Sequence, residues 1–205
     1  MANLRALGIN CTLKGGTAPS STDLLVQQVL DELDTAGVEV MGPPVRVADL
    51  NIKPGVTSDE GDGDDWPALR ERIMGADILV FGTPIWLGQP SSVAKRVTER
   101  MDAFLSETDD GGRMPSFGKV AVVAVVGNED GAHHVSAELY QALGDVGFTI
   151  PANATTYWVG EAMGGTDYKD LEKTPESVSG TTKQVAVNAA HLATLLEASG
   201  YPPSS

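Results

Sequence analysis

Residues 11–23 bring together side chains that can bind an anion. The stretch holds two glycines, one lysine (Lys14) and no acid before its last residue, Asp23. Its hydroxyl side chains are Thr12, Thr17, Ser20, Ser21 and Thr22. An apolar run precedes the stretch and an amphipathic run follows it, so the expected context is strand, loop and helix, with Thr22 as the helix N-cap. Because hydroxyls and free backbone N–H groups at a helix N-terminus bind phosphate, the sequence predicts a phosphate site at this turn.

Two further loops follow apolar runs and could hold a flat ring. The loop at 84–92 begins with an apolar platform and continues with a glycine that allows close backbone approach; these residues are Pro84, Ile85, Trp86, Leu87 and Gly88. The loop at 127–134 offers small and polar groups for the far edge of such a ring, namely Gly127, Asn128, Asp130 and Gly131. A phosphate at one end and a planar heteroaromatic ring at the other describe FMN.

Several other nucleotide and hydrolase signatures are missing from the sequence. The first loop contains no G-x-G-x-x-G dinucleotide motif and no G-x-x-x-x-G-K-[ST] triphosphate motif. The chain also has no G-x-S-x-G nucleophile elbow. No pattern of metal ligands stands out, because the acidic run at 51–65 lacks suitable spacing; we expect that run to be a solvated, mobile loop.

The composition narrows the class of protein and its partners. With 205 residues, 41% of them hydrophobic, the chain is expected to form one domain, 1–205. A net charge of −14 disfavours nucleic acid and anionic membranes as partners. The apolar runs are too short to cross a bilayer, and the N-terminus lacks a secretory signal pattern. The single cysteine, Cys11, suits a small buried residue in a reducing cytoplasm, where we expect the protein to act.

Apolar runs and amphipathic segments alternate along the whole chain. Strands are predicted at 4–10, 45–50, 77–83, 119–126 and 149–159, the last of them broken near Pro151. Helices follow them at 24–33, 66–74, 93–105, 135–146 and 181–198. Such alternation predicts an α/β fold: a flavodoxin-like parallel sheet of five strands in the order 2-1-3-4-5, with helices on both faces. The three loops then meet at the carboxyl ends of the central strands, where such sheets bind ligands.

The same segments resemble a known family. Cys11-Thr12-Leu13-Lys14, Ser20-Ser21-Thr22, the runs 82–89 and 127–134, Gly160 to Met163 and Gly165 to Tyr168 are similar to the flavodoxin-like NAD(P)H-dependent FMN reductases. The resemblance covers nearly the whole chain. It implies that Thr12, Lys14, Ser20, Ser21 and Thr22 face the FMN phosphate. It also implies that residues 84–88 hold the isoalloxazine ring and that Gly127, Asn128 and Gly131 complete the pocket.

The first loop departs from the family pattern Ser-x-Arg-x-Gly-x-Asn-Thr. Thr12 replaces the serine of that pattern, Lys14 replaces the arginine and Ser21 replaces the asparagine. The loop is also longer than the family's usual first loop. Lysine lacks the bidentate fork of arginine, so Lys14 could not make the bidentate phosphate contact that the family's arginine can make. The family also implies a homo-oligomer, a dimer or tetramer, in which Tyr157, Trp158 and Tyr168 could serve a subunit interface.

Two functions follow from the resemblance and stay open at this point. In the first, the protein takes hydride from NADH or NADPH and passes electrons to a small acceptor such as a quinone or free flavin. In the second, it is an electron carrier or FMN-binding module without nicotinamide turnover. Long loops at 51–65 and 160–178 favour the enzyme, since they could build a second pocket. No catalytic side chain is assigned, and His133 and His134 are expected to be polar residues of a helix start.

Overall fold

A single twisted sheet forms the centre of the molecule. The computed structural model describes residues 3–162 and 164–203. Its main strands are β2 (Glu39–Val40), β1 (Arg5–Asn10), β4 (Ile78–Trp86), β6 (Val120–Gly127) and β7 (Thr155–Val159), in that spatial order and all parallel. This arrangement confirms the predicted 2-1-3-4-5 order. Two short strands raise the total to seven: β3 (Val45–Arg46) pairs with β1, and β5 (Gln89–Pro90) pairs antiparallel with β4.

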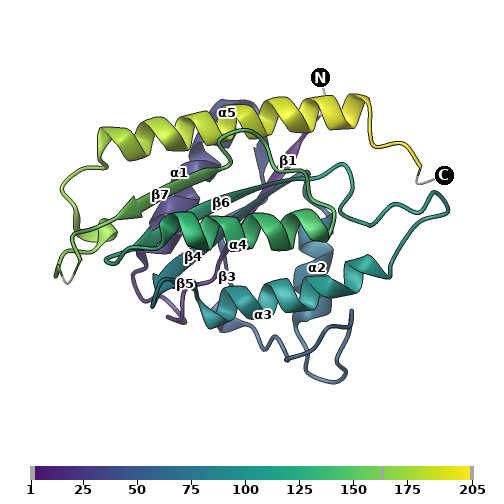
Figure 1. Ribbon diagram of the computed structural model, residues 1–205, viewed down its shortest axis with the longest axis horizontal. Helices are drawn as coiled ribbons and strands as arrows, with labels where there is room; N and C mark the ends of the chain where they lie inside the picture. Colours follow the sequence, from purple (N-terminus) through teal and green to yellow (C-terminus); the bar gives the residue numbers. More distant parts are fainter. Residues whose placement is uncertain (1–2, 163, 204–205) are drawn as a thin grey trace.

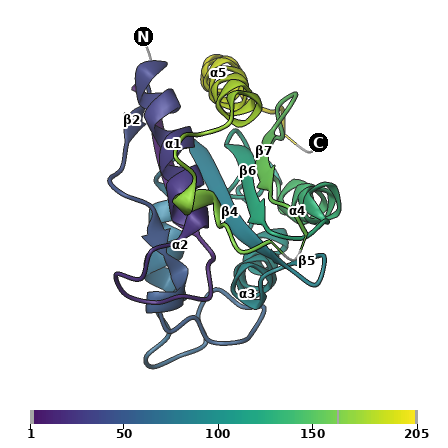
Figure 2. The same ribbon diagram turned by 90° about the vertical axis from the view of Figure 1, so that its left-hand side faces the viewer.

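Helices cover both faces of the sheet, as Figures 1 and 2 show. On one face lie α1 (Ser21–Thr35) and α5 (Glu176–Ala198), and on the other lie α2 (Trp66–Met74), α3 (Ser92–Met101) and α4 (Ala132–Asp145). Each face encloses its own apolar cluster. The central strands are buried on both faces, which is why β6 reads as an unbroken run of valine and alanine. In the described part of the chain, three short 3₁₀ helices complete the fold: Val47–Asp49, Asp102–Leu105 and Tyr168–Asp170.

Two glycines let α1 lie close to the sheet at the topological switch point between β1 and β4. A Cβ on Gly82 of β4 would come within 2.2 Å of Val26 Cγ2, and one on Gly8 of β1 within 2.7 Å of Val26 Cγ1. Both glycines therefore allow the first helix to approach β1 and β4. The N-terminus of α1 is thereby fixed at the carboxyl edge between these two strands.

The second predicted strand was too long, and α5 begins earlier than predicted. The second strand, expected at 45–50, is only β3, because Val47–Asp49 turns into a 3₁₀ helix. The last predicted strand is interrupted near Pro151, as expected, because proline has no N–H to donate: Thr149 makes an isolated bridge to Val120, and the strand proper, β7, begins at Thr155. Helix α5 starts at Glu176, five residues before the predicted 181.

The acidic segment 51–65 is held in place at its C-terminal end. The expectation of a solvated, mobile loop was wrong for Asp64, whose side chain is fully buried against that of Arg100, with 2.7 Å between Nη1 and Oδ2. Arg100 belongs to α3, and its exposed fraction is also 0%. The guanidinium also donates to the carbonyl oxygens of Thr57 and Lys53. This buried ion pair ties the segment to α3.

Candidate functional site: a cleft at the carboxyl edge of the sheet

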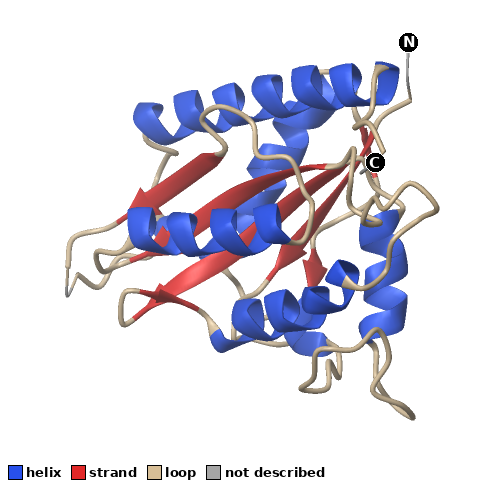
Figure 3. Cartoon of the chain, turned by 45° about the vertical axis from the view of Figure 1, so that its right-hand side comes forward, coloured by secondary structure: helices blue, strands red, loops and turns tan. Residues whose placement is uncertain are grey.

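A cleft of about 480 Å³ lies at the carboxyl ends of β1, β4, β6 and β7. These ends and their loops gather at one side of the molecule, on the left in Figures 1 and 3. The cleft is lined by Thr12, Leu13, Lys14, Ser20, Ser21, Thr22, Pro84, Ile85, Trp86, Leu87, Val126, Gly127, Asn128, Glu129, Trp158, Ala162, Asp167 and Tyr168. Its volume suits a small organic molecule. Eleven of the fourteen cofactor-binding residues predicted from the sequence line this cleft.

The start of α1 forms the hydroxyl-rich end of the cleft. Ser20, not Thr22 as predicted, is the N-cap, because its Oγ accepts a hydrogen bond from Asp23 N at 3.2 Å. Thr22 instead lies inside the first turn, 2% exposed. Among the described residues, no acceptor is found for the backbone N–H groups of Ser21 and Thr22, the first two of the helix. Two free amides and a helix dipole at this position favour an anion.

Polar contacts hold the rest of the first loop in shape. Asn10, at the end of β1, donates to Asp23 Oδ1 at 2.8 Å and accepts from Thr12 N at 3.0 Å. Arg46 donates to Ala18 O at 2.6 Å and lies 3.7 Å from Asp23 Oδ2. The guanidinium of Arg46 therefore binds groups of the first loop and of the start of α1. Lys14 lines the cleft, and no ion pair to it is found among the described residues, so its ammonium is available to a ligand.

The second predicted loop is largely a β-hairpin. Strand β4 runs through Pro84, Ile85 and Trp86 and turns back at Leu87 and Gly88 into β5. Leu87 and Gly88 have φ angles of 52° and 73°, both in the left-handed region. Trp86 and Leu87 are 53% and 91% exposed. The hairpin thus presents an apolar wall, with a strained leucine at its tip.

Three predicted residues do not line the cleft, namely Gly88, Asp130 and Gly131. Gly88 and Gly131 instead meet each other: a Cβ on Gly131, whose φ is 130°, would lie 2.9 Å from Gly88 Cα. Asp130 accepts from Gly131 N at 2.7 Å. These residues pack the hairpin tip against the start of α4.

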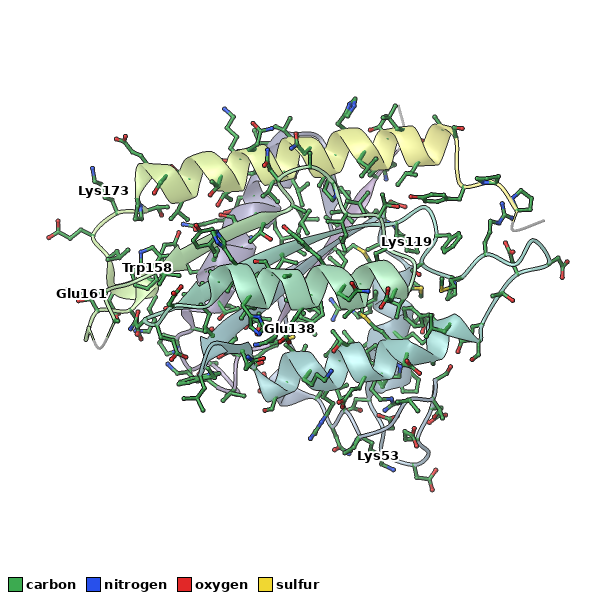
Figure 4. The ribbon with its side chains drawn as sticks, viewed as in Figure 1. Lys53, Lys119, Glu138, Trp158, Glu161 and Lys173 are labelled. Carbon is green, nitrogen blue, oxygen red and sulfur yellow. The ribbon has the colours of Figure 1, made fainter. Side chains whose placement is uncertain are left out.

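A third wall of the cleft was missed by the sequence reasoning. It comes from the end of β7 and the following segment, with Trp158, Ala162, Asp167 and Tyr168. Figure 4 shows Trp158 and Glu161 at this end of the molecule, far from Lys119 at the other end. Trp158 and Tyr168 were expected at a subunit interface, but their rings lie 5.5 Å apart within the cleft wall, and Tyr168 is 2% exposed. The similarity of residues 165–168 to the family was the sequence feature that could have predicted this wall. Met163, which belongs to the same region of similarity, lies outside the described residues.

The remaining chemical candidates lie outside the cleft lining. His133 contacts Tyr157 OH at 3.2 Å, and His134 contacts Gln89 at 2.9 Å and Glu138 at 2.7 Å. Both histidines are in the first turn of α4, as expected of polar helix-start residues. Cys11 is 0% exposed, and burial raises the pKa of its thiol well above the ordinary value. It packs as a small apolar residue, as predicted.

The cleft fits the chemistry of FMN at both ends. One end offers hydroxyls, free amides and a lysine for a phosphate. The other offers Pro84, Ile85, Trp86 and Trp158 for a flat, largely apolar ring. Asn128 also lines the cleft, and its Nδ2 donates to Asp167 Oδ1 at 3.0 Å. A polar anion site and an aromatic slot within one cleft are what a ring with a phosphorylated side chain requires.

Comparison with known proteins agrees with this chemistry. A family model described as NADPH-dependent FMN reductase matches residues 4–164. The chain belongs to this family. It is an FMN-dependent oxidoreductase of the flavodoxin-like fold, and FMN is the cofactor of the family. No helix in the described part of the chain has the length and apolarity needed to cross a membrane.

Two curated relatives match almost the whole chain. The 8-demethyl-8-aminoriboflavin-5′-phosphate synthase of Streptomyces davaonensis is 34% identical over 210 residues, which cover 97% of this chain and 80% of that protein. A Mycobacterium bovis protein named divalent metal cation transporter MntH is 38% identical over 202 residues. This match covers 95% of the chain but only 29% of the transporter, so the chain spans less than a third of that relative's length.

Solved structures share the fold. RosB, crystallised with the bound intermediate 8-demethyl-8-formylriboflavin-5′-phosphate, has a TM-score of 0.86 and 33% identity; the match covers 97% of this chain and 82% of that one. A flavone reductase has a TM-score of 0.68 at 19% identity and covers 97% of this chain and 66% of that one. At that identity the second likeness supports the fold alone.

Proposed function

We propose that this protein oxidises NADH or NADPH with bound FMN and passes the electrons to a small acceptor such as a quinone or free flavin. The observation that carries the proposal is the cleft, in which an anion site at the start of α1 and an aromatic slot lie at one sheet edge. FMN, when bound, supplies the hydride and electron transfer chemistry. The protein's part is to bind, orient and shield it.

Each group of residues has a distinct part in this proposal. Thr12, Ser20, Ser21, Thr22 and Lys14 bind the phosphate, together with the free amides of the first turn. Pro84, Ile85, Trp86 and Leu87 form one wall for the ring. Gly127 and Asn128 form its edge, and Gly88, Asp130 and Gly131 keep the hairpin in place. No side chain is assigned as a proton donor, because hydride transfer itself does not need one.

The experiment is a flavin spectrum followed by an anaerobic titration. Purified protein, supplied with FMN, should show flavin absorbance after removal of free cofactor. Mixing with NADH and with NADPH should then bleach the flavin rapidly and show which reductant is preferred. Absence of flavin would refute the proposal; bound flavin that neither nucleotide bleaches would favour an electron carrier. The acceptor is then sought by reoxidation with quinones and free flavin.

A second candidate function is chemistry on the flavin itself. It is favoured by the names of two relatives at 33–34% identity, which concern riboflavin-5′-phosphate derivatives altered at position 8. The chain covers four fifths of each. Mass spectrometry of FMN recovered after aerobic incubation with the protein separates the candidates. An unchanged FMN mass over many turnovers of NAD(P)H supports the reductase, and a changed mass supports the alternative.

The cellular setting belongs to the same proposal. We expect a protein that acts in the cytoplasm as a dimer or tetramer, without nucleic acid or membrane partners. Light scattering of the purified protein tests the oligomeric state. Tyr157, which is 38% exposed and lies outside the cleft, is the remaining candidate for a contact between subunits.

A further inference from the structure

A segment far along the chain lies across the start of α1. Residues 167–174 include the 3₁₀ helix Tyr168–Asp170 and lead into α5. The backbone N–H of Lys169 donates to Ser21 Oγ at 3.2 Å. The hydroxyl of Ser21, the first residue of α1, is therefore in direct contact with a segment outside the first loop.

A group of partly buried hydrogen bonds anchors this segment to α1. Tyr168 OH donates to Gln28 Oε1 at 2.6 Å, and Gln28 Nε2 donates to Thr174 Oγ1 at 2.8 Å. Gln28, two turns along α1 from Ser21, thus holds the segment at both ends. Tyr168 is 2% exposed and its ring centroid lies 5.5 Å from that of Trp158, whereas Gln28 and Thr174 are half-buried, so the tyrosine end of the anchor is the part shielded from water. A hydrogen bond in such a place is costly to leave unmade.

The contact restricts how the Ser21 hydroxyl can be used. A serine hydroxyl has one proton to donate and lone pairs that accept. With the Lys169 amide occupying an acceptor position, the proton is left to donate to another group, and Ser21 lines the cleft. An oriented donor binds an anion better than a free rotor, because less rotational freedom is lost on binding.

We propose that Gln28, Tyr168 and Thr174 are positioning residues for phosphate binding. They hold segment 167–174 against α1, so that the Lys169 amide orients the Ser21 hydroxyl toward the phosphate of the flavin. The proposal rests on the proposed function, since it requires FMN in the cleft. If the docked form of the segment becomes less populated, the apparent FMN affinity falls by the same fraction.

The test is a double-mutant cycle on FMN affinity, measured by flavin fluorescence on the full-length protein. Gln28→Leu removes both anchoring hydrogen bonds and should weaken FMN binding about three- to tenfold. The matched control is Gln27→Leu on the same helix, whose side chain bonds only Asp31, at 2.8 Å; it should change affinity less than twofold. In a Ser21→Ala background the effect of Gln28→Leu should shrink below twofold, because the hydroxyl that it positions is gone.

Two further readouts separate positioning from general damage. Tyr168→Phe keeps the ring and removes the hydroxyl that bonds Gln28, so it should reproduce the loss of FMN affinity even where Gln28→Leu folds poorly. Riboflavin, which lacks the phosphate, should bind the wild type and Tyr168→Phe equally well.

The outcomes separate this inference from the proposed function. If the wild type binds no FMN, the proposed function fails. If the wild type binds FMN but Tyr168→Phe and Gln28→Leu match Gln27→Leu, the inference is overturned. It is equally overturned if their losses persist in full without the Ser21 hydroxyl.

Discussion

The buried ion pair between Arg100 and Asp64 gives the sharpest test of how the fold is held together. Both side chains are 0% exposed, and Nη1 lies 2.7 Å from Oδ2. Arg100 donates further to Lys53 O at 2.9 Å and to Thr57 O at 2.9 and 3.1 Å. Replacing Arg100 with methionine keeps much of the side-chain length but leaves the Asp64 carboxylate buried without its counter-ion.

The size of the effect follows from burial. Removing one partner of a buried pair costs about 3–5 kcal/mol, because the remaining charge stays desolvated and unpaired. For a chain of this length each kcal/mol lowers Tm by about 2–4 °C. Arg100→Met should therefore lower the free energy of unfolding by about 3–5 kcal/mol and Tm by about 6–20 °C. Both are measured by urea and thermal unfolding followed by circular dichroism.

Arg96 on the same helix provides the matched control. Its side chain is exposed and makes one hydrogen bond, to Ile52 O at 3.2 Å. Arg96→Met should cost less than about 1 kcal/mol. A cost for Arg100→Met within 1 kcal/mol of the control would refute the reasoning, since the buried charge would then contribute no more than a surface one.

Three other predictions concern the site, the hairpin and acid stability. Ser21→Asp should weaken FMN binding at least about fivefold by isothermal titration, because a like charge beside the phosphate costs about 1–4 kcal/mol. Ser179→Asp near the start of α5 should not weaken it, and an unchanged affinity of Ser21→Asp would remove Ser21 from the site. Leu87→Asn should raise Tm by a few degrees, because asparagine tolerates the φ of 52° better than leucine; a lower Tm would contradict strain at this turn. Burial by itself would raise the pKa of Asp64, but hydrogen bonds from Glu60 N, Arg100 and Trp66 N lower it to about 2. Its stabilisation is thus fully present above about pH 4 and is lost as the pH falls toward 2; urea titrations should show this slope, and Asp64→Asn should flatten it.

Much of the architecture could be predicted because it depends on local pattern. The buried parallel strands β1, β4 and β6 appear in the sequence as unbroken apolar runs, and the helices between them have amphipathic spacing. Strand alternation with right-handed crossovers then fixes which loops meet at one edge. For this reason most of the predicted site residues, from Thr12 to Asn128, line a single cleft.

The boundaries that failed depended on which of several possible local hydrogen bonds forms. Pro84, Ile85 and Trp86 look like a loop because Pro84 and Gly88 punctuate the sequence, yet the antiparallel partner β5 extends β4 through them. Ser20 and Thr22 are both good N-caps by type. Only the backbone geometry decides that Ser20 accepts from Asp23 N.

The sequence by itself determined the fold class, the cofactor chemistry and the place where the first loop meets the sheet. The tertiary structure alone decided that Trp158 and Tyr168 close the cleft and that Arg100 is buried on Asp64. The physical reason is the sequence separation of the residues that interact. Hydrophobic periodicity and helix capping depend on residues a few positions apart in the sequence. Burial of a charge, or the formation of a cleft wall, depends on contacts between segments that are far apart in the sequence.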